Sequence, residues 1–279
     1  MKIFPRRPAS VRKALLVSLL SFCASFIVGF AVCAPLLAVG GYVCTVLALA
    51  VNTLLSFVVP GLFLRYYTVG GSMALSGGKA SKTCLFLAAA LAVICQSLVE
   101  WAAHVDWLVT QALGLTGGVS QASKLLLASV CDFSDVWHWV ATLVVVALLP
   151  ALCEEFFFRA GLLPLLRRAT GGWRSAVVLS AVIFSALHLD PSGFLSRTVL
   201  GLILGIVFVA TRSIWPSVIF HFLNNAMCVI TVAVAETPLD ALTAEPVSPT
   251  FFETSFSLMF TIYLLYIIPQ VAKGKLKLF

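Results

Sequence analysis

The run from Val140 to Leu166, VATLVVVALLPALCEEFFFRAGLLPLL, is the strongest indication of the structural class of this chain. It is longer than the ~20 apolar residues that a helix needs to cross a bilayer. Its middle nevertheless holds Glu154, Glu155 and Arg159. A charge at the centre of a bilayer costs roughly 2.5–3.5 kcal/mol even on a lenient insertion scale. The run therefore predicts a transmembrane helix whose charged residues find partners inside the protein.

The composition of the whole chain agrees with a membrane protein. Of 279 residues, 61% are apolar and 10% are charged, against about 45–50% and 25% in soluble domains. This excludes a water-soluble globular enzyme and predicts an all-α, polytopic transmembrane bundle with an internal polar cavity, built as one membrane domain over residues 1–279. About eight spans are expected, near 14–38, 42–66, 84–105, 140–166, 175–189, 196–211, 214–235 and 254–271. The fifth and sixth of these runs are short and could be tilted or re-entrant.

The basic residues predict the orientation. With the N-terminus inside, only Lys124 and Arg197 of the 18 Lys and Arg residues fall on the outer side. By the positive-inside rule, both termini are expected to be cytoplasmic. The net charge of +7 does not indicate nucleic-acid binding, because no basic patch is interleaved with aromatic residues. Eight acids fall on the outer side: Asp106, Asp132, Asp135, Asp190, Glu236, Asp240, Glu245 and Glu253.

The ionisable residues inside the spans are expected to pair. Glu100 and His104 are four apart, hence on one helix face, and we expect them to satisfy each other. Arg159 follows Glu155 by four residues, the favourable order for an ion pair. Neighbouring helical residues lie ~100° apart, so the two acids should not point the same way and Glu154 is left to face the cavity. A buried salt-bridge cluster that only joins helices is the alternative.

Two further apolar runs place polar groups at a matching depth. His188 ends the fifth run, and His221 and Asn225 lie in the seventh. Counted from the basic residues at the inner ends, these groups and Glu154 all lie roughly 14–21 Å deep in straight helices. We therefore expect one polar layer contributed by three helices.

Such a layer has the groups that peptide hydrolysis needs. A desolvated glutamate can act as general base on water, a histidine can share that water, and a second histidine and an amide can donate to an oxyanion. Neither a serine or cysteine nucleophile motif nor HExxH occurs. Glu154, His188 and His221 could instead bind zinc. At this stage the metal-free and the metal-dependent routes both stay open.

The three motifs resemble those of the CAAX-protease and bacteriocin-processing (CPBP) family of intramembrane endopeptidases, which includes the type II CAAX prenyl endopeptidases. Glu154-Glu155 with Arg159 looks like EExxxR, Phe184 to His188 like FxxxH, and His221 to Asn225 like HxxxN. The resemblance covers about residues 142–235. It implies that Glu154 and His188 activate water and that His221 and Asn225 stabilise the oxyanion, with Glu155 and Arg159 structural and no cofactor, although older descriptions of the family make such residues metal ligands.

The resemblance implies a membrane-associated protein or peptide as substrate, met at the lipid bilayer, with no role for nucleic acid. Some family members trim prenylated CAAX proteins, and many bacterial members are linked to peptide maturation or bacteriocin immunity. The compact chain with short loops is similar to the bacterial branch, so a bacterial cell membrane is expected. The main alternative is a non-proteolytic protein that binds a peptide or bacteriocin for immunity or as a scaffold. A proton-coupled transporter is disfavoured because no inverted repeat is evident.

Overall fold

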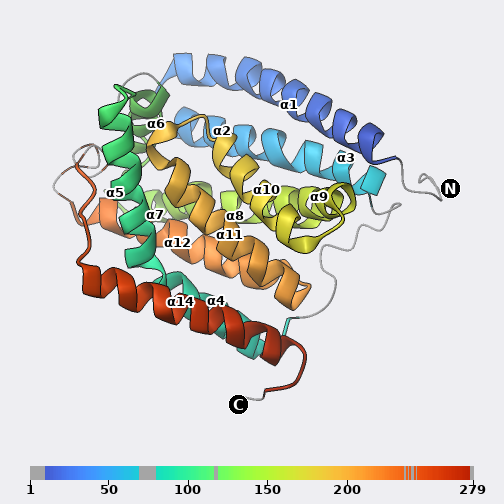
Figure 1. Ribbon diagram of the computed structural model, residues 1–279. Helices are drawn as coiled ribbons and strands as arrows, with labels where there is room; N and C mark the ends of the chain where they lie inside the picture. The colour runs from blue at the N-terminus through green and yellow to red at the C-terminus, as the bar shows by residue number, and fades with distance from the viewer. Residues whose placement is uncertain are drawn as a thin grey trace.

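The computed structural model describes residues 10–68, 80–115, 119–235, 237, 239, 242 and 244–276, and all regular structure in these segments is helical. The expected all-α transmembrane bundle is confirmed (Figure 1). Outside the described residues lie the predicted outer acids Glu236 and Asp240 and the predicted inner cations Lys2, Arg6, Arg7, Lys79 and Lys277.

The α-helices of the described segments are α1 (Val11–Val39), α2 (Tyr42–Thr53), α3 (Val59–Thr68), α4 (Lys82–Ile94), α5 (Gln96–Ala112), α6 (Val119–Ala128), α7 (Val136–Thr142), α8 (Leu149–Phe157), α9 (Leu163–Thr170), α10 (Trp173–Ala186), α11 (Phe194–Thr211), α12 (Trp215–Ala233) and α14 (Phe251–Ala272). Three π-helical turns, η1 (Leu54–Val58), η2 (Leu143–Leu148) and η3 (Phe158–Leu162), and a 3₁₀ turn, η4 (Pro191–Gly193), complete the described elements.

The helices account for the predicted spans. Six stretches are long and apolar enough to cross a membrane: Val11–Val39, Tyr42–Arg65, Val136–Thr170, Pro191–Thr211, Trp215–Ala233 and Phe251–Ala272. The pair α4 and α5, bent by 44°, makes a seventh if it is one span. The fifth predicted run is α10, whose 14 residues reach about 21 Å, less than the ~30 Å hydrocarbon core. The chain is therefore an integral membrane protein, with six or seven full-length spans near the eight expected.

The sixth span is longer than its apolar run suggests. It begins at Pro191 and has 21 residues, so it is not short. Asp190 caps its first turn by accepting from the backbone N–H of Ser192. The apolar pattern missed this turn because its residues are polar, whereas the cap lets the helix start there.

Each π-helical turn comes just before a proline. η1, η2 and η3 are followed by Pro60, Pro150 and Pro164. Proline cannot donate to the helix ladder, and its ring crowds the carbonyl four residues earlier, which a wider π turn relieves. Val136–Thr170 thus runs on past both Pro150 and Pro164, with a π turn on either side of the α-helical turns that hold Glu154 and Glu155.

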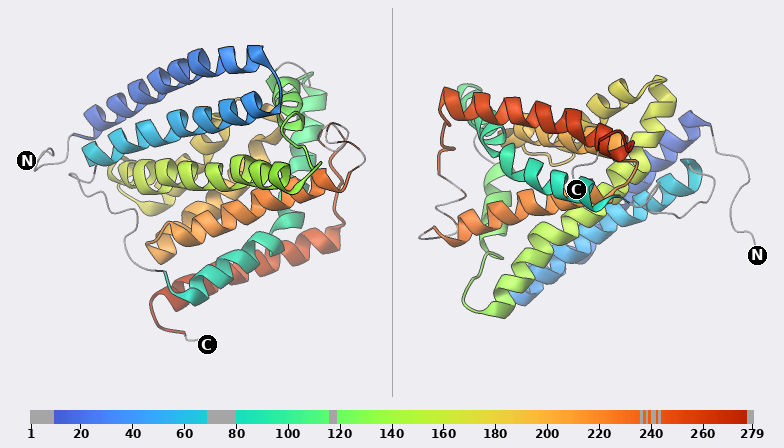
Figure 2. Two further views of the ribbon diagram at one scale, coloured as in Figure 1. Left: turned by 180° about the vertical axis from the view of Figure 1, so that it is seen from behind. Right: turned by 90° about the horizontal axis from the view of Figure 1, so that it is seen from below.

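Figure 2 shows how the bundle is layered. Seen from behind, α1 is followed by α2 and α3, then by α7 and α8, then by α12, α4 and α14, and each of these layers contacts the next. In Figure 1, α10 and α11 cover one face of this row. The first turn of α1 and the last turns of α11 and α14 lie toward the same side of the bundle.

Two glycines allow α10 and α11 to approach each other. A Cβ on Gly201 would lie 3.0 Å from Cα of Ala181, and one on Gly205 would lie 3.0 Å from Cγ1 of Val177. The spacing G-x-x-x-G is the small-residue pattern that brings membrane helices close. This contact with α11 fixes the position of α10, the helix that ends just before His188.

Candidate active site

The charged residues of EExxxR are buried, and two of them, Glu155 and Arg159, are paired. Glu154 is 7% exposed, Glu155 0% and Arg159 1%. Oε2 of Glu155 lies 3.0 Å from Nε of Arg159, which confirms the predicted ion pair. Nη2 of Arg159 donates to the carbonyl of Gly201, at 3.5 Å, and therefore connects η3 with α11. The guanidinium also lies over the ring of Phe184, 5.3 Å from its centroid.

His221 lies between the two glutamates. Its Nδ1 is 3.1 Å from Oε1 of Glu155, and its Nε2 is 3.9 Å from Oε2 of Glu154. The expectation that the two acids point apart is wrong at their carboxylates, which converge on opposite nitrogens of one ring. The ~100° between neighbouring positions separates the Cβ atoms, but a flexible glutamate side chain can turn back toward a ring supplied by another helix. Oε2 of Glu154 is buried and has no hydrogen-bond partner among the described residues.

His188 joins this cluster through Phe184. Its Nδ1 lies 2.8 Å from the carbonyl oxygen of Phe184, one turn earlier, to which it donates. The Phe184 ring lies 5.0 Å from the His188 ring and 6.0 Å from the His221 ring, between centroids. With Nδ1 carrying the proton, the neutral imidazole of His188 has Nε2 as its acceptor.

Asn225 lies outside these contacts. One turn beyond His221 on α12, its Nδ2 donates to the carbonyl of Val146 in η2 at 3.5 Å, and its Oδ1 accepts from Asn224 at 3.3 Å. The structure therefore brings Glu154, Glu155, Arg159 and His221 into direct contact and His188 through a shared ring, but leaves Asn225 at the edge of the expected layer. The internal cavity predicted around them stays a prediction.

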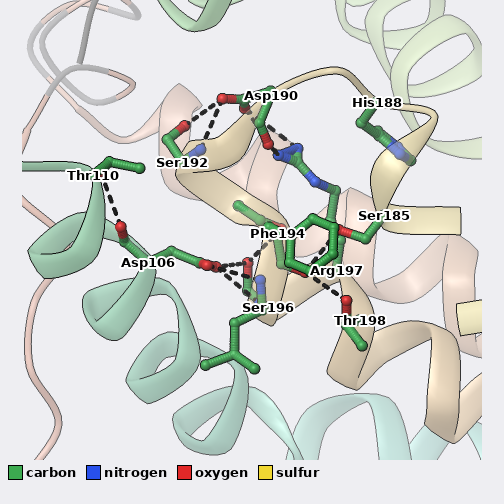
Figure 3. Close-up of polar contacts among 12 residues, drawn as sticks. Asp106, Thr110, Ser185, His188, Asp190, Ser192, Phe194, Ser196, Arg197 and Thr198 are labelled. Atoms are coloured by element: carbon green, nitrogen blue, oxygen red, sulfur yellow. Dashed lines mark hydrogen bonds and ion pairs between the residues drawn. The ribbon is translucent and has the colours of Figure 1, made fainter. Parts of the chain in front are cut away.

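A polar network that the motifs do not reveal holds the loop after His188 (Figure 3). Nη2 of Arg197 donates to the backbone oxygen of Asp190 at 2.7 Å and lies 2.9 Å from its Oδ2. Asp106, from α5, accepts from the backbone N–H of Leu195 at 2.7 Å and of Ser196 at 2.9 Å. Asp106 thus caps α11 from a different helix.

The same loop is tied to α10. Oγ of Ser185 donates to the carbonyl of Phe194 at 2.6 Å, so this hydroxyl has a structural partner. Leu189 adopts a φ of 55°, in the left-handed region that a β-carbon disfavours. His188 therefore lies in a strained turn that is braced on both sides. The charge pattern of the sequence puts Asp106, Asp190 and Arg197 on the outer side and indicates no role for them. Only Asp190-Pro191-Ser192 carries a signal, that of a helix start.

The side chains of Glu154, His188 and His221 are not arranged as a metal site. Among the described residues, no three His, Cys, Asp or Glu side chains are grouped to hold a metal ion. The possible zinc ligands Glu154, His188 and His221 therefore do not fit one ligand set, and no step below is routed through a metal.

Comparison with known proteins agrees with the three motifs. Residues 136–227, a third of the chain, match the family model described as type II CAAX prenyl endopeptidase, Rce1-like. Neither a curated protein nor a solved structure matches the chain significantly. The matched segment holds both glutamates, Arg159, both histidines and Asn225. The match to Rce1-like endopeptidases thus confirms the resemblance for the segment that carries the site.

Proposed function

We propose that this protein is an intramembrane endopeptidase that hydrolyses a peptide bond, near the membrane surface, of a membrane-associated protein or peptide. The family match supports protease activity in general. The observation that carries the detailed proposal is the buried, unpartnered Oε2 of Glu154 beside Nε2 of His221. An unpartnered buried carboxylate oxygen costs free energy, and a water molecule held for reaction would satisfy it.

The first step is water activation. Glu154 takes one proton from a water molecule that donates its other hydrogen to Nε2 of His188. The water oxygen then attacks the carbonyl carbon of the scissile bond. The donation from Nδ1 of His188 to Phe184 supports this role, because it leaves Nε2 as an acceptor.

The second step needs donors for the oxyanion. Glu155 accepts from Nδ1 of His221, so a protonated ring keeps an N–H on Nε2 that can donate to the developing oxyanion. Asn225 supplies the second donor once its amide leaves the carbonyl of Val146. The proton held by Glu154 then passes to the leaving nitrogen, the C–N bond breaks, and a carboxylate and an amine are released.

A glutamic-type mechanism is favoured over a metal-dependent one because the three possible metal ligands, Glu154, His188 and His221, are not grouped. The proposed substrate class is the one that the family implies, a membrane-associated polypeptide. The protein itself is proposed to lie in a bacterial cell membrane with both termini cytoplasmic. Prenylated CAAX proteins and bacteriocin-like peptides are the two candidates to be offered as substrates.

The test is isotope incorporation by the full-length protein in proteoliposomes. With a peptide substrate in H₂¹⁸O, the new C-terminal carboxylate gains one ¹⁸O under single turnover. Glu154→Gln should lower the rate by about 10²–10⁴-fold, the usual contribution of a general base. Glu100→Gln changes an exposed glutamate on α5 in the same way and should keep the rate. Equal loss in both variants, or turnover by Glu154→Gln near the wild-type rate, would refute the role of Glu154.

A further inference from the structure

One cavity of the structure lies away from the glutamates and histidines. It has a volume of about 620 Å³ and is lined by the first turns of α10 and the last turns of α11 and α14, within the ~300–1,000 Å³ of small-molecule sites. Its walls are apolar and include Val178, Ile206 and Pro269. α10, about 21 Å long, separates this cavity from His188, so it is distinct from the candidate active site.

Basic side chains gather at this cavity. Arg174, Arg212 and Lys273 line it together with Trp173. The guanidinium of Arg212 lies 5.3 Å from the centroid of the Trp173 ring, and that of Arg167 lies 4.5 Å from it. Among the described residues, none of these four cations forms an ion pair with a carboxylate. The cluster therefore carries uncompensated positive charge where apolar wall meets the helix ends.

The backbone at Arg212 supports a role for its side chain. Arg212 closes α11 with a φ of 55°, in the left-handed region. Glycine or asparagine usually occupies this capping position because a longer side chain is strained there. Arginine at this position keeps a guanidinium over Trp173 and beside the cavity at some cost in backbone energy.

From these contacts we infer that the cavity binds an anionic glycerophospholipid of the surrounding membrane. Its apolar walls take an acyl chain, and the cations at its rim bind the phosphate headgroup. Basic pockets between membrane helices, at the cytoplasmic side, suit anionic headgroups in this way, and the positive-inside pattern predicts that side here. A zwitterionic lipid such as phosphatidylcholine carries a cation that offsets its phosphate, so it would neutralise less of the positive charge. A soluble anion would leave the apolar walls empty. The lipid would brace α10 against α11, and its binding does not depend on the proposed protease activity.

The test uses the full-length protein purified in detergent micelles. Phosphatidylglycerol, phosphatidylcholine with the same acyl chains, and glycerol 3-phosphate are added separately. Native mass spectrometry then counts bound molecules, and thermal unfolding gives the change in Tm. We expect one tightly bound phosphatidylglycerol and a higher Tm with it, but neither effect with the other two. Equal binding of both lipids, or binding of glycerol 3-phosphate alone, would overturn the inference.

Two variants separate the cavity from general surface charge. Arg174→Gln with Lys273→Gln removes two rim charges and should weaken phosphatidylglycerol binding about ten- to thirtyfold, at ~1 kcal/mol per cation. Arg12→Gln with Lys13→Gln removes two exposed charges from the start of α1 and should leave binding within twofold. Val178→Trp fills the cavity, keeps the cations, and should also weaken binding. Equal loss in both double variants, or unchanged binding by Val178→Trp, would contradict the inference.

Discussion

Oε1 of Glu155 lies 3.1 Å from Nδ1 of His221, while Oε2 of the same carboxylate lies 3.0 Å from Nε of Arg159. One buried acid therefore bridges a cation of its own helix and an imidazole of α12. This bridge gives Glu155 a role beyond neutralising Arg159, because it also orients the ring whose other nitrogen faces Glu154.

Arg159→Ala should lower the stability of the protein. It leaves Glu155 as a buried carboxylate without its cation, and removing one partner of a buried pair typically costs about 3–5 kcal/mol. Steady-state abundance in membranes and the Tm of the purified protein measure the loss. Arg12→Ala, at an exposed position, should change neither. Normal abundance of Arg159→Ala with lost activity would instead place Arg159 among the residues that contact the reacting atoms.

Arg197→Gln should impair catalysis through the loop that holds His188. The guanidinium anchors Asp190, two residues after His188, and a displacement of about 1 Å can cost a factor of ~10² in rate. We expect kcat to fall about 10- to 100-fold with little change in KM, and Arg197→Lys to recover part of it. Asp135→Asn, which alters another loop carboxylate that caps a helix, is the matched control. If KM and kcat both fall to the same extent in Arg197→Gln and in Asp135→Asn, Arg197 does not act by positioning His188.

Gly201→Ala should separate α10 from α11. The new Cβ would meet the backbone of Ala181 at 3.0 Å, and overpacking of this kind costs about 1–3 kcal/mol. Tm and peptide turnover should both fall. Gly172→Ala has open space around its Cβ and should cost less than about 1 kcal/mol. If the two variants unfold at the same temperature, the close helix approach does not limit stability.

Chelation tests the choice between the two mechanisms. Dialysis of the purified protein against a strong zinc chelator should leave peptide turnover within twofold of the untreated rate, because Glu154, His188 and His221 do not form one ligand group. The zinc content of the active protein, measured by elemental analysis, should be well below one per chain. Loss of activity that returns on adding zinc would assign these residues to a metal.

The helices were predictable because each apolar run satisfies its own backbone hydrogen bonds. The Glu155–Arg159 pair was predictable for a related reason, since both residues lie on one helix at a spacing that brings them together. Contacts between helices were not. His104, expected to pair with Glu100, instead has its Nδ1 3.2 Å from the carbonyl of Pro246.

The polar contacts around the site were also not predictable, because they too join different helices. The position of His221 between two glutamates depends on how α12 is rotated against α8. The cap that Asp106 places on α11 joins residues about ninety positions apart. Neither relationship leaves a periodic signal in the sequence, because both depend on tertiary packing.

The most direct test compares the peptide termini in membranes of cells that lack this protein, complemented with the wild type, Glu154→Gln or Glu100→Gln at equal abundance. If Glu154 is the general base, new termini appear with the wild type and with Glu100→Gln but not with Glu154→Gln. Those termini then identify the substrate. Identical termini in all three complemented strains would contradict proteolysis by this site and favour the non-proteolytic binding role.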